Sequence, residues 1–149
     1  MAKRQLLSPV HRLNLKICCL LTLLLLLGSA ATIPYIWESK SLWYKAGLDK
    51  ILLQLAKVSG LLAAVLFFLQ IILAQRLVIL DRIFGLDRIY LLHRLNGLVI
   101  LGLALVHALL VLIPEGLENL PIGWKFWPEI VGAALLTVLV VFVGTASFR

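Results

Sequence analysis

HRLNGLVILGLALVH, residues 93–107, is an apolar run with a histidine at each end. At roughly 100° per residue, fourteen helical steps turn about 1400°, some 40° short of four full turns. His93 and His107 therefore face nearly the same side of one helix, about 21 Å apart along its axis. Because an imidazole in hydrocarbon is costly without a polar or metal partner, the pair is a candidate functional site.

The composition is that of a membrane protein. Hydrophobic residues make up 62% of the 149 residues and charged residues 14%, and the mean hydropathy is +1.07. Soluble domains are about half apolar and about a quarter charged. The net charge of +7 does not indicate nucleic acid, because the basic residues cluster at the ends of apolar segments. We expect one compact bundle in contact with membrane lipid.

Four apolar segments are long enough to cross a bilayer as helices. After an N-terminal tail (1–14), the predicted spans are 15–33, 51–75, 91–113 and 129–148. They are apolar around most of their circumference, and none alternates like a barrel strand. The sequence therefore predicts an all-α, multi-pass transmembrane helical bundle. A cleaved signal peptide ending near Ser29-Ala30-Ala31 is the alternative interpretation of the first span.

The charges between the spans predict the orientation. Positive charge is concentrated in the tail and in the loop between the second and third spans, which carries Arg76, Arg82, Arg88 and Arg94. The positive-inside rule then places both termini and this loop, residues 77–92, in the cytoplasm. His93 lies near the cytoplasmic face and His107 nearer the outer face. We expect an integral protein of a bacterial inner (plasma) membrane.

The two histidines are predicted to bind haem. Neutral imidazole is a common axial ligand of haem iron, and this spacing suits two haems stacked across a membrane. Gly97 and Gly102 could let a flat porphyrin approach the backbone, although close helix packing is at least as common a use of glycine in membranes.

Two basic residues are further candidates for haem binding. Lys57 and Arg76 lie near opposite ends of the second span, where they could pair with the anionic haem propionates. Snorkelling of Lys57 to the interface and positive-inside anchoring by Arg76 are the alternative explanations.

Residues 76–110 resemble the ferric reductase-like transmembrane domain shared by ferric reductases, NADPH oxidases and bacterial relatives. The matching elements are Leu86-Asp87-Arg88, His93 six residues after the Asp, and His107 fourteen residues further on. The run KVSGLLAAVLFFLQIILAQR, residues 57–76, resembles the preceding helix of the bacterial members. The resemblance covers roughly residues 45–148.

The resemblance implies a six-helix bundle, of which four helices are present, with two b-type haems. It assigns His93 to the inner haem and His107 to the outer haem, and Lys57 and Arg76 match positions where family members carry basic residues near the propionates. It further implies that a cytoplasmic FAD- and NAD(P)H-binding domain feeds electrons to the inner haem. They would leave from the outer haem to ferric iron or oxygen outside.

The sequence also departs from the family pattern. In the family each haem is held by two histidines, the second pair coming from the fifth helix, whereas here no histidine follows His107 and no Gly-rich dinucleotide motif is present. We expect a truncated or split product, a chain completed by a partner chain with the remaining helices and flavin domain, or a relative without haem. By itself the chain should not catalyse a complete reductase reaction.

Two other functions stay open. One is a non-catalytic integral membrane protein or assembly partner that binds no haem and whose histidines only form hydrogen bonds between helices. The other is a small transporter or channel subunit, although the usual intramembrane carboxylates and broken helices are missing from the sequence.

Overall fold

The computed structural model describes residues 8–38, 40–75, 77–115 and 127–147, and all regular structure in these ranges is helical. Three helices are long and apolar enough to cross a membrane: α1 (Pro9–Ile36), α3 (Gly47–Ala74) and α5 (Leu86–Glu115). The shorter helices are α2 (Lys40–Trp43), α4 (Val78–Phe84) and α6 (Trp127–Ser147). The prediction of an all-α, multi-pass helical bundle is confirmed.

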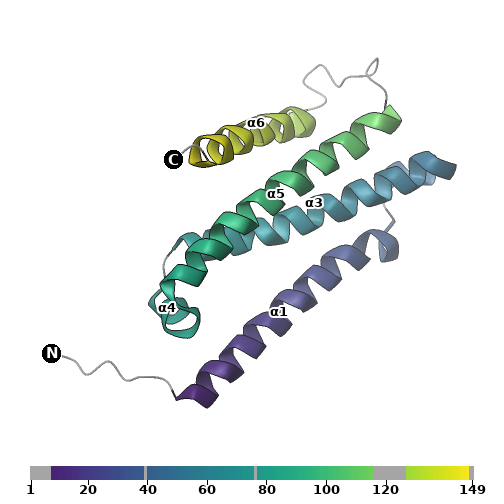
Figure 1. Ribbon diagram of the computed structural model, residues 1–149. Helices are drawn as coiled ribbons and strands as arrows, with labels where there is room; N and C mark the ends of the chain where they lie inside the picture. Colours follow the sequence, from purple (N-terminus) through teal and green to yellow (C-terminus); the bar gives the residue numbers. More distant parts are fainter. Residues whose placement is uncertain (1–7, 39, 76, 116–126, 148–149) are drawn as a thin grey trace.

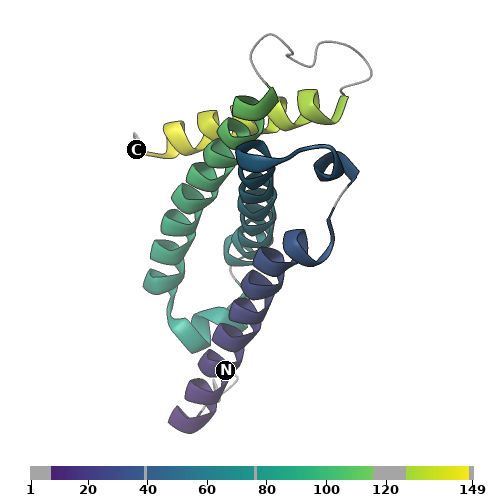
Figure 2. The same ribbon diagram turned by 90° about the vertical axis from the view of Figure 1, so that its right-hand side faces the viewer.

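The centre of the molecule is the antiparallel pair of α3 and α5, which share the most extensive interface. Figure 1 shows α3 between α5 and α1, with the short α4 at the turn that joins α3 to α5. Figure 2 shows that α6 crosses the far end of α5 instead of running alongside the other long helices. Lys57, His93 and His107 therefore lie on one pair of packed helices.

The third predicted span begins earlier than expected, because Gly85 separates two helices. Its φ of +87° is a left-handed conformation that side-chain-bearing residues rarely adopt. Its amide donates to the Asp81 carbonyl oxygen at 2.9 Å and ends α4, and its carbonyl accepts from the Ile89 amide at 3.2 Å and opens α5. The segment 77–92, which connects the second and third predicted spans, is therefore mostly helical, and whether it faces the cytoplasm stays a prediction.

The surface of the long helices is apolar. Leu25 on α1, Phe68 on α3 and Phe142 on α6 are 74%, 67% and 70% exposed. Monomeric soluble proteins rarely expose contiguous apolar patches of more than a few hundred Å². Such side chains need lipid or other helices around them, while the helical backbone satisfies its own hydrogen bonds. The chain is an integral membrane protein.

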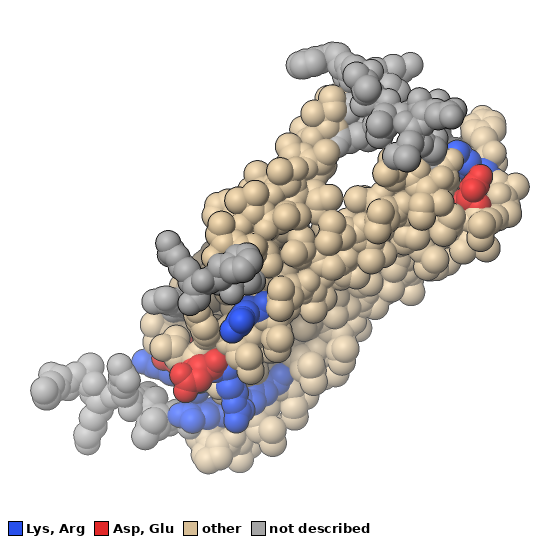
Figure 3. All heavy atoms as spheres, turned by 45° about the horizontal axis from the view of Figure 1, so that its top comes forward, with Lys and Arg blue, Asp and Glu red and all other residues tan. Residues whose placement is uncertain are grey.

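Charged side chains lie toward the two ends of the bundle. On the face shown in Figure 3, an uncharged band separates a mixed charged cluster at one end from a smaller one at the other. The Lys50 ammonium lies 2.6 Å from a Glu38 carboxylate oxygen, and the Lys16 ammonium lies 6.0 Å from the centre of the Phe84 ring. Which end faces the cytoplasm stays a prediction.

Candidate functional site

The two histidines are placed symmetrically along α5. This helix has 30 residues, which makes it about 45 Å long, against about 30 Å for the hydrocarbon core of a bilayer. His93 follows Leu86 by seven residues, and His107 precedes Glu115 by eight. Each imidazole therefore lies roughly 10–12 Å from its end of the helix. One histidine occupies each half of the membrane-spanning segment.

Both imidazoles contact α3. The Nδ1 atom of His107 lies 2.6 Å from the carbonyl oxygen of Ala56, and the Nε2 atom of His93 lies 3.3 Å from the Nε2 atom of Gln70. Ala56 and Gln70 are fourteen residues apart on α3, the same separation as that of His93 and His107 on the antiparallel α5. The prediction that the two histidines share one side of a helix is confirmed.

At the His107 level, small residues of α3 let the imidazole approach the backbone. A Cβ atom added to Gly60 would lie 2.8 Å from His107 Nδ1 and 3.0 Å from its Cε1, so only glycine leaves room for the ring. Gly60 and Ala56 form a small-xxx-small pattern, which allows close helix approach in membranes. The Ala56 carbonyl also accepts from the Ser59 hydroxyl at 2.8 Å.

The contact with Ala56 decides which nitrogen of His107 is available. A carbonyl oxygen can only accept, so His107 Nδ1 carries the proton and donates it. In the neutral ring the lone pair then lies on Nε2, the nitrogen farther from the helix backbone. A backbone carbonyl that fixes the tautomer in this way is a common feature of metal-binding histidines.

At the His93 level, two amide side chains join α3 to α5. The Gln70 Nε2 atom donates to the carbonyl oxygen of His93 at 3.0 Å and also lies against the His93 ring. The Asn96 Nδ2 atom donates to the Gln70 Oε1 atom at 2.7 Å and to the Leu66 carbonyl oxygen at 2.9 Å. The other ring nitrogen of His93, Nδ1, is buried without a hydrogen-bond partner among the described residues.

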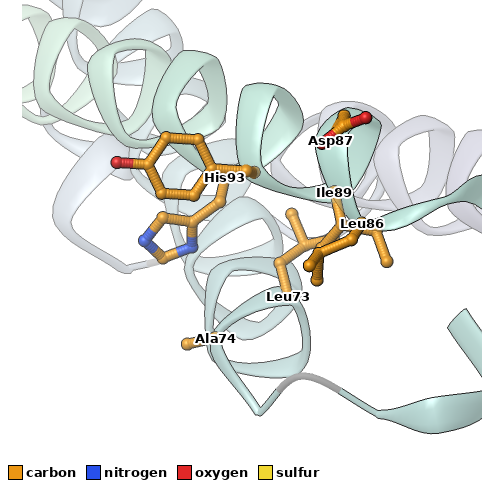
Figure 4. Close-up of a pocket in the computed structure, with 7 residues that line it drawn as sticks. Leu73, Ala74, Leu86, Asp87, Ile89 and His93 are labelled. Atoms are coloured by element: carbon orange, nitrogen blue, oxygen red, sulfur yellow. The ribbon is translucent and has the colours of Figure 1, made fainter. Parts of the chain in front are cut away.

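An open cleft of about 530 Å³ lies beside His93, within the size range of cofactor pockets. It is lined by Leu73 and Ala74 of α3 and by Leu86, Asp87, Ile89, Tyr90 and His93 of α5. Figure 4 shows His93 at one side of the cleft, with the aliphatic side chains of Leu73, Leu86 and Ile89 grouped at the other. The cleft therefore offers an apolar wall and one imidazole, together with the polar side chains of Asp87 and Tyr90.

The donor set fits haem and does not fit a bare metal ion. Among the described residues, no three His, Cys, Asp or Glu side chains lie together as a metal-binding group. Haem iron already has four porphyrin nitrogens and needs only one or two axial ligands from protein. One imidazole at each level is therefore enough for one protein ligand to each haem.

The remaining candidates are placed unequally. Lys57 follows Ala56 on α3, so it lies at the level of His107, and its side chain is half-buried. Arg76 lies outside the described residues. A Cβ on Gly97 would lie 3.3 Å from the Gln70 amide nitrogen, which favours the packing explanation for that glycine, whereas nothing lies within 4 Å of one on Gly102.

Gly60, Gln70 and Asn96 are candidate functional-site residues that were not predicted from the sequence. Two signals could have found them. Gly60 follows Ala56 in the small-xxx-small spacing, and Gln70 and Asn96 are uncharged polar residues within apolar spans. In lipid such side chains need partners on neighbouring helices.

Comparison with known protein families matches residues 59–149, more than half of the chain, to the family described as "Ferric reductase like transmembrane component". The match contains α5 and both histidines, together with Gly60, Gln70 and Asn96. Lys57 lies just before it. Comparisons with curated proteins and with solved structures gave no match.

Proposed function

The chain belongs to the ferric reductase-like transmembrane component family, and from this premise we propose that it carries electrons across a membrane by holding two b-type haems. The observation that supports the proposal best is the pair of imidazoles on one side of α5, one in each half of the helix. Each packs on α3 through one ring nitrogen, His107 through Nδ1 against the Ala56 carbonyl oxygen and His93 through Nε2 against the Gln70 amide. When bound, haem supplies one-electron redox chemistry.

In this proposal His107 ligates the outer haem through Nε2, and His93 ligates the inner haem. The Ala56 carbonyl keeps the His107 ring in one orientation, and Gly60 makes room for it. Lys57 and Arg76 are proposed as cationic partners of the propionates at the outer and inner levels.

The rest of the electron path is proposed from the family. A partner that binds FAD and NAD(P)H supplies electrons on the cytoplasmic side, and ferric iron or oxygen accepts them outside. A partner chain or segment with further helices would complete the binding of each haem. The apolar side chains that α5 and α6 expose, such as Leu109 and Phe142, leave surface for such helices or for lipid.

The test is electron flow through closed vesicles. Protein purified from its own membranes, with any partner retained, is placed in lipid vesicles that enclose ferricyanide, and dithionite is added outside. We expect the enclosed ferricyanide to be reduced at least ten times faster than in protein-free vesicles. The increase should disappear in His93→Ala and His107→Ala and persist in His11→Ala, whose histidine is exposed near the start of α1. Equal rates with and without wild-type protein would reject the proposal.

A second candidate function is supported by the same contacts. Both histidines make polar contacts between helices, and such contacts alone could hold α3 against α5 in a membrane protein without haem. If this second function is correct, the protein purified from its native membrane is stable and colourless. Haem content therefore separates the two functions.

A further inference from the structure

We propose that Gln70, held in place by Asn96, is a positioning residue for His93. Its amide makes Nε2 the proton-free nitrogen of the imidazole and covers that nitrogen until iron takes its place. The inference rests on the proposed function and deepens it, since it explains how the inner ligand is prepared. It follows from a chain of hydrogen bonds whose direction is fixed by two backbone carbonyls.

The orientation of both amides follows from these carbonyls. Asn96 Nδ2 lies 2.9 Å from the Leu66 carbonyl oxygen, which can only accept, so this atom of Asn96 must be the NH₂ group. The same nitrogen lies 2.7 Å from one amide atom of Gln70, which must therefore be the oxygen. The NH₂ group of Gln70 then faces His93, in agreement with its 3.0 Å contact to the His93 carbonyl oxygen. Swapping oxygen and nitrogen in either amide would bring like groups together.

The orientation of Gln70 selects the tautomer of His93. Its second N–H lies 3.3 Å from His93 Nε2, so this ring nitrogen must accept and the ring proton lies on Nδ1. The opposite tautomer would set two donors against each other. Nδ1 is then a buried donor without a hydrogen-bond partner in the described part of the chain, which is unfavourable. The ring keeps this tautomer because the amide network holds an N–H donor against Nε2.

Both histidines therefore reach the same tautomer by different routes. In His107 the Ala56 carbonyl takes the Nδ1 proton directly, and in His93 the Gln70 amide occupies Nε2. In each ring the lone pair is on Nε2. At 3.3 Å the Gln70 contact lies beyond the usual range of N–H donor distances, so it is weak and iron can replace it. Gln70 would keep its bond to the His93 carbonyl oxygen and Asn96 its bond to Leu66, so the network would survive the exchange.

The test is the tautomer of each histidine in haem-free protein, read from the ¹⁵N chemical shifts of its ring nitrogens. Full-length chain is labelled at histidine, and His11→Gln simplifies the spectrum. In the wild type we expect His93 and His107 both to show protonated Nδ1 and unprotonated Nε2. A wild-type His93 with its proton on Nε2 overturns the inference, whatever the behaviour of any variant.

The matched variants are Gln70→Met, which removes the amide at nearly constant length, and Gln75→Met, which changes an exposed glutamine at the C-terminal end of α3. We expect Gln70→Met to lose the single-tautomer signal of His93 and to leave that of His107 unchanged, while Gln75→Met changes neither. If Gln70→Met folds and leaves the His93 signal unaltered, the inference is overturned and the proposed function is not. If wild-type protein purified from its own membranes contains no haem, the proposed function is overturned, whereas the tautomer of His93 is decided by the ¹⁵N shifts alone.

Discussion

His107→Ala is expected to remove the outer haem and to leave the inner haem bound, and His93→Ala is expected to do the reverse. The two imidazoles stand about 21 Å apart on α5, so one replacement does not reach the other site. In our proposal this chain supplies one ligand to each haem, and replacing that histidine by alanine removes the only bond from this chain to the iron. We therefore expect near-complete loss of one haem per chain in each variant.

The measurement is a redox titration of the visible absorption of each purified variant. The wild type should titrate as two haem components, and each histidine variant should lack a different one. His11→Ala is the control, because this exposed histidine near the start of α1 has no place in the site. If both variants lose the same component, or neither loses any, the assignment of one haem to each histidine fails.

Gly60→Ala is expected to abolish the outer site and to destabilise the fold modestly. The new Cβ would lie 2.8 Å from His107 Nδ1, closer than side-chain carbons come to other atoms, so the ring must move and its 2.6 Å contact with Ala56 is lost. Overpacking costs about 1–3 kcal/mol, whereas alanine in a helix gains about 1 kcal/mol over glycine. These two terms together destabilise the fold by about 0–2 kcal/mol, to which the lost contact with Ala56 adds, so the haem content should be compared in folded protein only.

Gly28→Ala is the matched control, because this glycine lies within α1 and nothing stands within 4 Å of a Cβ added there. It should keep both haem components and match or slightly exceed the wild type in stability. Retention of the outer haem by Gly60→Ala, with the tautomer of His107 unchanged, would show that this close contact does not position the ligand.

The helices and the histidine face were predictable because both follow from local rules. An apolar run of about twenty residues must form a helix in a bilayer, and fourteen steps along it return to nearly the same side whatever surrounds it. The start of α5 was less predictable. It depends on the positive φ of Gly85, which ends α4 and begins the next helix within a segment interpreted as a loop.

The sequence carries signals for the partner residues, but it could not show which histidine each partner meets. Gln70 meets His93, and Ala56 and Gly60 meet His107, only because α3 and α5 pack in one particular antiparallel register. That register is set by side chains that are far apart in sequence. The direction of α6 across the end of α5 depends on tertiary packing in the same way (Figure 2). The roles of Lys57 and Arg76 stay predictions.

Haem content is the most direct test of the central claim that His93 and His107 hold haem within the membrane. A pyridine haemochrome assay on protein purified from its own membranes compares the wild type with the double variant His93→Ala/His107→Ala. We expect close to two b-type haems per chain in the wild type and almost none in the double variant. A colourless wild type, or a double variant with undiminished haem, would contradict the account.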